Sequence, residues 1–146
     1  MADSFGDHSM LGETSLNVLL KTMQPMRHSE EYIFCTVANG TAYDASLRPI
    51  GLFQEEEGLT LILSRLQADA AGIPYSAVFV LITLTVHSSL EAVGFLAAIA
   101  TQLASHGISV NPVSAFYHDH LFVPVAQAET AMALLQILRE ENSAQS

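Results

Sequence analysis

The sequence predicts an α+β protein made of two small units in tandem, and three observations lead to this fold class. Residues 78–86 are almost continuously apolar, which is typical of a strand covered on both faces. A helical stripe follows, in which apolar residues recur every three or four positions from Leu90 to Leu103. Strand-like and helix-like segments alternate in both halves, and 146 residues suffice for one domain or two very small ones.

The first half is expected to begin with a helix and a strand. Ser15 precedes a short amphipathic segment, residues 16–23, and Pro25 is expected to end it. The aromatic and β-branched run Tyr32–Val37 predicts a strand. Residues 38–49 contain Asn-Gly, Asp and Pro, so we expect a loop or an irregular hairpin there.

A hairpin and a second helix complete the first half. Strands are expected at 50–54 and 59–63, and the three glutamates between them are typical of a solvated turn. Ser64 and Gln67 have the spacing of a helix capping box. They predict a short helix over 65–71, which Gly72 ends.

The second half starts with the apolar strand at 78–86. Ser88 and Glu91 again have the capping-box spacing, so the next helix is expected to begin at Ser88 and to end at Gly107. Pro112 implies that the following strand lies at a sheet edge or carries a bulge. A turn at 118–120, a strand at 121–125 and a helix at 128–139 complete the expected elements.

The predicted element order is α-β-β-β-α followed by β-α-β-β-α. Each half resembles a ferredoxin-like βαββαβ unit with one end missing, because the first lacks its first strand and the second its last. We therefore expect the two halves to complete each other's sheets by strand exchange. The expected organisation is a disordered segment at 1–12, a first unit at 13–75, a second at 76–140 and a polar tail at 141–146.

The composition argues against several classes of function. With 5 basic and 15 acidic residues, a net charge of -10 disfavours binding to nucleic acid or to an anionic membrane. No apolar run reaches the roughly 20 residues of a spanning helix, and no signal peptide is recognisable. Cys35 is the only cysteine, which excludes an internal disulfide, and we expect a cytoplasmic protein.

The second half resembles an ACT domain, the small-molecule-binding module of amino-acid metabolism. The resemblance is carried by the strand 79–86, the helical residues 96–104, the segment 107–111, Val113-Ser114 and the strand 121–125. The whole chain is similar to small bacterial proteins with two ACT-like units in tandem. It also resembles the regulatory half of aspartate kinases and cytosolic arginine sensors, in which paired ACT units bind an amino acid at their interface.

This resemblance implies a non-catalytic regulatory or sensor protein that binds an amino acid or a similar small metabolite. No cofactor is implied. Because ACT units usually pair, and because the helix after the central strand is rich in alanine, we expect a homodimer or a higher homo-oligomer. The alternatives are a structural or adaptor module that only oligomerises, or a metal-dependent enzyme.

The expected ligand-binding residues lie at the start of the helix after the central strand. Unpaired amides and the positive end of a helix suit a carboxylate, and ACT relatives bind amino acids at this loop. The candidates are His87, Ser88, Ser89 and Leu90, together with Asn111, which would hold an amine or a carboxylate. Alternatively Ser88 only caps the helix, His87 packs, and Asn111 is a bulge residue with a structural hydrogen bond.

A possible secondary site is the segment His118, Asp119 and His120. Two imidazoles on one face of a strand could bind a metal, with His87 and His106 as the nearest further candidates. Zinc usually takes three or four protein ligands, so we expect a polar turn and no metal. The sequence contains no GxSxG, HExxH, Walker or GxGxxG motif, so we expect no catalytic residues.

Overall fold

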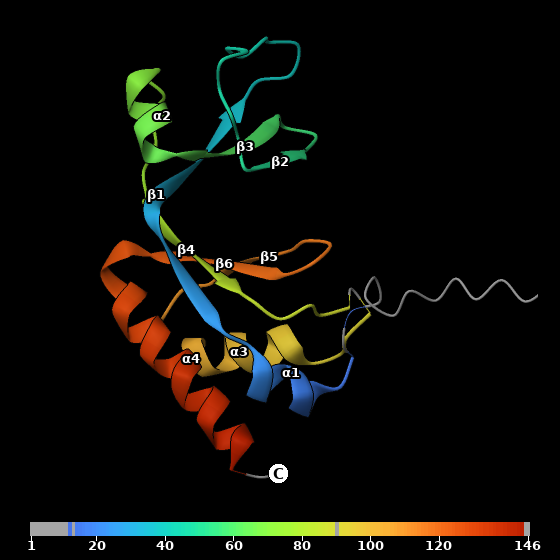
Figure 1. Ribbon diagram of the computed structural model, residues 1–146. Helices are drawn as coiled ribbons and strands as arrows, with labels where there is room; N and C mark the ends of the chain where they lie inside the picture. The colour runs from blue at the N-terminus through green and yellow to red at the C-terminus, as the bar shows by residue number, and fades with distance from the viewer. Residues whose placement is uncertain (1–11, 13, 90, 145–146) are drawn as a thin grey trace, which may run out of the picture.

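A computed structural model describes residues 12, 14–89 and 91–144. These residues form one six-stranded antiparallel sheet, in the order β2-β3-β1-β4-β6-β5, with helices packed against it (Figure 1). The strands are β1 (Pro25–Val37), β2 (Gly51–Gln54), β3 (Leu59–Ser64), β4 (Phe79–Leu84), β5 (Asn111–Ser114) and β6 (Asp119–Pro124). The helices are α1 (Leu16–Thr22), α2 (Arg65–Ala70), α3 (Phe95–Ala104), the 3-10 helix η1 (Val125–Gln127) and α4 (Ala128–Ser143).

Strands β1 and β4 form the centre of the sheet, and both halves use them. The C-terminal part of β1, Tyr32–Val37, pairs with β3, whereas its N-terminal part pairs with β4. The pairing of β1 with β4 shifts register between Arg27 and Glu31, just before the residues of β1 that also pair with β3. The first half thus uses β4 as its last strand, and the second half uses β1. The expected strand exchange between two ferredoxin-like units is confirmed.

The first unit lacks a helix, whereas the sequence predicted that it lacks its first strand. The first unit has all its strands but lacks a helix between β1 and β2, where residues 38–50 form a loop. Asn39, Gly40 and Pro49 favour turns over a helix in this segment. Helix α1 does not pack on the first unit. It packs against α4 and α3 of the second unit.

The sheet is curled, and its two faces differ. On the outer side, β4 and β6 pack against α1, α3 and α4, while β1 and β3 pack against α2 and Leu47. The side chains that alternate with these point to the inner side, on which none of the described helices packs. The buried apolar cluster described on this inner side consists of Tyr32, Ile62, Leu81 and Phe122.

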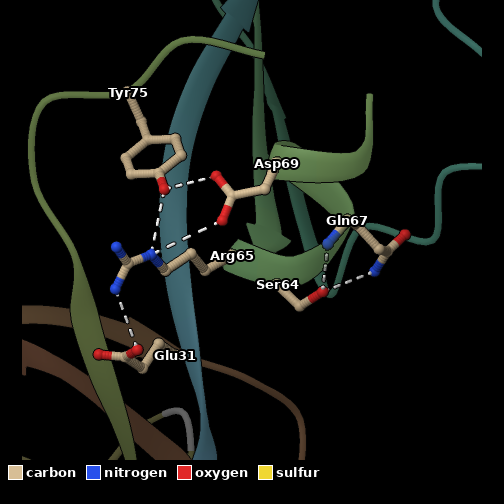
Figure 2. Close-up of polar contacts among 6 residues, drawn as sticks. All are labelled: Glu31, Ser64, Arg65, Gln67, Asp69 and Tyr75. Carbon is tan, nitrogen blue, oxygen red and sulfur yellow. Dashed lines mark hydrogen bonds and ion pairs between the residues drawn. The ribbon is translucent and has the colours of Figure 1, made fainter. Parts of the chain in front are cut away.

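Two helix starts test the capping predictions. Ser64 caps α2 as expected, since its Oγ accepts the Gln67 N–H at 3.3 Å (Figure 2). The second prediction is wrong. Helix α3 begins at Phe95, with Gly94 at φ +89° before it, and the buried Ser88 hydroxyl donates to Asp119 instead. A hydroxyl that can satisfy a buried carboxylate lowers the free energy more there than at a cap exposed to water.

Figure 2 also shows how α2 is tied to its surroundings. Arg65 bonds the Tyr75 hydroxyl through Nε at 3.1 Å and pairs with Glu31 of β1 through Nη1 at 3.2 Å. The Tyr75 hydroxyl in turn donates to Asp69 at 2.6 Å. Because the charged partners are largely exposed, this network orients α2 and adds little to stability.

Several element boundaries also differ from the prediction. β1 begins at Pro25, earlier than the sequence predicted. The polar residues from Arg27 to Glu31 show no strand pattern, but they belong to the part of β1 that pairs with β4. α4 continues through the residues expected to begin the polar tail, and ends at Ser143. Gly107 at φ +72° ends α3 as expected, and β5 is an edge strand, as Pro112 predicted. Residues 1–11 of the expected disordered segment, Leu90, and residues 145–146 of the tail lie outside the described residues.

Candidate functional site

A small cavity of about 120 Å³ lies beside the first turn of α3. Gly94 precedes the helix, and the first intrahelical bond runs from the Ala98 N–H to the Gly94 carbonyl at 2.9 Å. The amides of Phe95, Leu96 and Ala97 therefore have no intrahelical acceptor and carry the positive end of the helix dipole. The cavity is lined by Ser89, Ala92, Gly94, Phe95, Leu96, Ala97, Ser114 and Asp119.

Among the described residues, Asp119 is the only carboxylate that lines this cavity, and it is held in one orientation. It is 6% exposed. Its Oδ2 accepts the Ser88 hydroxyl at 2.8 Å, and its Oδ1 accepts the Ser114 hydroxyl at 2.7 Å. Neither partner is charged, and both ion pairs of the described residues involve Arg65 instead. A buried carboxylate with two hydroxyl donors and, among the described residues, no ion-pair partner is a suitable acceptor for a ligand ammonium group.

The structure brings only part of the expected ligand-binding set to this cavity. Ser89 lines it, and Ser88 is bonded to Asp119 at its edge. His87 lies next to Tyr117 instead, with 5.3 Å between ring centroids. Leu90 lies outside the described residues.

Asn111 does not line the cavity. It lies opposite Phe122, at the end of β5 away from the cavity, whereas Ser114 lies opposite Asp119 at the near end. A strand advances by about 3.3 Å per residue, so three residues separate the two ends of β5 by roughly 10 Å. A role of Asn111 in ligand binding stays a prediction of the family resemblance.

The segment from 118 to 120 is not a single turn. The turn closes between Ala115 and His118, and β6 begins at Asp119. His118 bonds the Val86 carbonyl at 3.0 Å, and His120 bonds the Thr83 hydroxyl at 2.9 Å. Their ring centroids are 6.4 Å apart. Within the described part of the chain, no three His, Cys, Asp or Glu side chains are placed to hold one metal ion.

Two signals in the sequence could have located this cavity. Asp119 is the only acidic residue between Glu91 and Glu129, and an isolated carboxylate in an apolar stretch needs a specific partner. Gly94 interrupts the helical stripe, and a glycine there can mark the helix start rather than its interior. Ser114 carries no distinguishing signal in the sequence.

A larger cavity, of about 440 Å³, lies under the loop at 38–50. It occupies the outer side of the first unit, where the second unit has α3. Cys35 lines it, and burial raises the pKa of that thiol, which makes it a poor nucleophile at neutral pH.

Two family models, each described as an ACT domain, match the chain in tandem at residues 11–80 and 77–136. A Vibrio cholerae protein of unknown function, VC0802, described as a possible transport protein, is 48% identical over 86% of this chain and 97% of its own, with a TM-score of 0.77. The chain belongs to the ACT-domain family. None of the curated proteins compared with it matches it.

Two more distant structures share the ACT fold of this chain. Agrobacterium tumefaciens protein Atu0741 is 17% identical over 80% of this chain and 89% of its own, with a TM-score of 0.59. The structure of aspartokinase alpha and beta subunits is 15% identical over 78% of this chain and 95% of its own, with a TM-score of 0.57. The resemblance to the ACT family that the sequence predicted is confirmed, and the aspartokinase structure shares the fold of this chain.

ACT domains are regulatory modules that bind small molecules, often amino acids. The small cavity beside α3 is consistent with this general property, because it combines helix amides with a buried carboxylate. Among the described residues, no helix has both the length and the apolar character needed to cross a bilayer.

Proposed function

We propose that this ACT protein is a non-catalytic sensor or regulator that binds an amino acid in the cavity beside α3. The observation that carries the proposal is the buried carboxylate of Asp119, which faces the same cavity as the first turn of α3. The two features offer opposite charges to the two charged groups of a zwitterion.

The ligand contacts follow from the charges in the cavity. The amides of Leu96 and Ala97 would donate to the α-carboxylate, as helix starts do to anions. The ammonium group would donate to Asp119 and to the hydroxyls of Ser89 and Ser114. Drug-sized ligands occupy pockets of about 300 to 1,000 Å³. The volume of about 120 Å³ therefore favours an amino acid with a small side chain.

Ligand binding would change the packing of the segment before α3. The Ser88 hydroxyl donates a hydrogen bond to Asp119, so an ammonium group that binds the same carboxylate would change this hydrogen bond. The described residues between β4 and α3, 85–89 and 91–94, would then adjust their position against β6. This coupling of ligand to a loop is how the binding event would reach a partner.

We further propose that the protein is a cytoplasmic homodimer at least, as expected from the pairing of ACT units. The edge strand β2, on which the Phe53 side chain is 70% exposed, supports an association surface. The same surface would serve a structural or adaptor module without a ligand, which is the second candidate.

A thermal-shift screen of the twenty amino acids at millimolar concentration separates these two candidates. A ligand that binds only the native state raises the melting temperature. We expect one or a few small amino acids to raise it, and the same amino acids to raise the melting temperature of Asp119→Asn protein less. If all twenty leave the melting temperature unchanged, the adaptor function replaces the sensor function.

A further inference from the structure

A separate cavity of about 340 Å³ lies on the inner side of the curled sheet. The β2–β3 and β5–β6 hairpins extend from the β1–β4 pair, one above and one below this inner side in Figure 1, and both contribute to its lining. The lining residues are His28, Tyr32, Ile50, Gly51, Ile62, Leu81, Val113, Ala115, His120 and Phe122. The cavity thus lies at the junction of the two ACT units, away from the cavity beside α3.

The floor of this cavity is aromatic and apolar. Tyr32, Ile62, Leu81 and Phe122 are each at most 7% exposed, although none of the described helices covers this face. Tyr32 and Phe122 meet edge to face, with ring centroids 6.0 Å apart. A planar or branched hydrocarbon group would find a preformed surface here.

Two imidazoles that line this cavity, those of His28 and His120, are hydrogen bonded to the hydroxyl of Thr83. His28 Nε2 lies 2.8 Å from Thr83 Oγ1, and His120 Nδ1 lies 2.9 Å from the same oxygen. Thr83 is 5% exposed and has one hydroxyl proton, so at least one imidazole must donate to it. The other ring nitrogens, Nδ1 of His28 and Nε2 of His120, have no hydrogen-bond partner among the described residues.

The electrostatic surroundings disfavour a positive charge on His120. Burial lowers the pKa of His120, and the neighbouring His118 and His28 lower it further, while Asp119 opposes them. None of the described residues that line the cavity is acidic. On β1, Glu30 is hydrogen bonded to the Tyr32 hydroxyl at 3.3 Å. An anion between the imidazoles would supply the missing counter-charge.

We propose that the cavity between the two hairpins binds a small monocarboxylate with an aromatic or branched apolar body. The apolar body would lie on Tyr32 and Phe122, and the carboxylate would accept N–H groups from His28 and His120. This site goes beyond the amino-acid site beside α3, because it has its own cavity and no lining residue in common with it.

Binding should strengthen as pH falls. A bound carboxylate stabilises the imidazolium form and raises the pKa of the imidazoles, so the complex takes up a proton that the free protein lacks. A tenfold gain in affinity corresponds to a rise of about one pKa unit in one linked group. We therefore expect phenylacetate to bind about tenfold more tightly near pH 6 than near pH 8.

The test is calorimetric titration of the full chain with phenylacetate and with its neutral analogue phenylacetamide. His28→Gln and His120→Asn retain the nitrogen that bonds Thr83 but cannot be charged. We expect each variant to weaken phenylacetate binding about tenfold near pH 6 and to reduce its pH dependence. His106→Gln, in the exposed turn after α3, is the matched control and should bind as the unchanged protein does.

Three results would overturn the proposal. The first is no binding of phenylacetate at millimolar concentration near pH 6. The second is equal affinity for acid and amide, and the third is unchanged binding by both histidine variants. Failure here is distinguishable from failure of the amino-acid site, because an amino acid that raises the melting temperature should bind without displacing phenylacetate.

Discussion

At the scale of single residues, Asp119 connects the fold to the proposed ligand. Its two hydroxyl partners come from the segment before α3 and from β5, so one carboxylate joins three parts of the second unit. Losing a partner of a buried polar group costs about 1 to 3 kcal/mol. The bonds of Asp119 therefore matter for stability as well as for ligand binding.

Ser114 and Asn111 provide a comparison between geometry and family resemblance. Because Ser114 lines the cavity and Asn111 does not, we expect Ser114→Ala to weaken amino-acid binding by about 1 kcal/mol, the net value of a hydrogen bond. Asn111→Ala should have a smaller effect. Affinities from calorimetry, read beside melting curves, test this order. A larger loss in Asn111→Ala would move the ligand toward the other end of β5.

His120 makes stability depend on pH. Its pKa is lowered in the folded protein, chiefly by burial, so the unfolded chain binds its proton more readily. Stability is then complete above the unfolded pKa of about 6.5 and decreases as pH falls below it. We expect the melting temperature to fall between about pH 7 and pH 5.5, and less steeply in His120→Asn. Identical pH profiles for the two proteins would contradict this assignment.

At the scale of elements, the start of α3 is the largest departure from the sequence prediction. Ser88 and Glu91 have the capping spacing, but spacing alone does not show that Ser88 is needed by a carboxylate 31 residues later. Ser64 and Gln67 have the same spacing and do form a cap, in which the Ser64 hydroxyl accepts the Gln67 N–H. Local patterns predicted the helices, whereas long-range polar contacts decided where α3 begins.

Gly94→Ala tests where α3 begins. Gly94 has φ +89°, a conformation that costs other residues roughly 1 to 2 kcal/mol. A Cβ there would meet Leu16 Cδ2 at an ordinary 3.5 Å, so the cost comes from the backbone. We expect urea denaturation to show a loss of that size. Unchanged stability would mean that the helix runs through position 94, as the sequence predicted.

At the scale of the whole molecule, the sequence predicted more of the fold than it predicted of the candidate site. Element order alone indicated two incomplete ferredoxin-like units that share strands, and β1 and β4 do so. It did not show that β1 begins at Pro25, because the polar residues 27–31 lack strand periodicity. The inner cavity was also missed, since His28, Thr83 and His120 are far apart in sequence and meet only through strand pairing.

Strand sharing predicts that neither half folds alone. A chain of residues 1–75 would lack β4, and a chain of residues 76–146 would lack β1, which leaves unpaired central strand edges. We expect each half alone to show no cooperative thermal transition by circular dichroism, and the two mixed halves to recover one. A cooperative transition in either isolated half would contradict the shared-sheet organisation.

Association is the second prediction at this scale. With Phe53 70% exposed on the edge strand β2, we expect light scattering to show a homodimer at micromolar concentration. Phe53→Lys should shift the protein toward the monomer, whereas Glu56→Lys, in the neighbouring turn, should not. A monomer in the unchanged protein would remove the proposed assembly.

The most direct test of the amino-acid site is calorimetric titration of the amino acid found by thermal shift into three proteins. They are the unchanged chain, Asp119→Asn and, as a matched control, the exposed Asp44→Asn. We expect one ligand per chain and equal affinity for the unchanged protein and Asp44→Asn. Asp119→Asn should bind at least about tenfold more weakly, as expected when a charged hydrogen bond is lost. Equal affinity for Asp119→Asn, in a protein with an unchanged fold, would contradict the account.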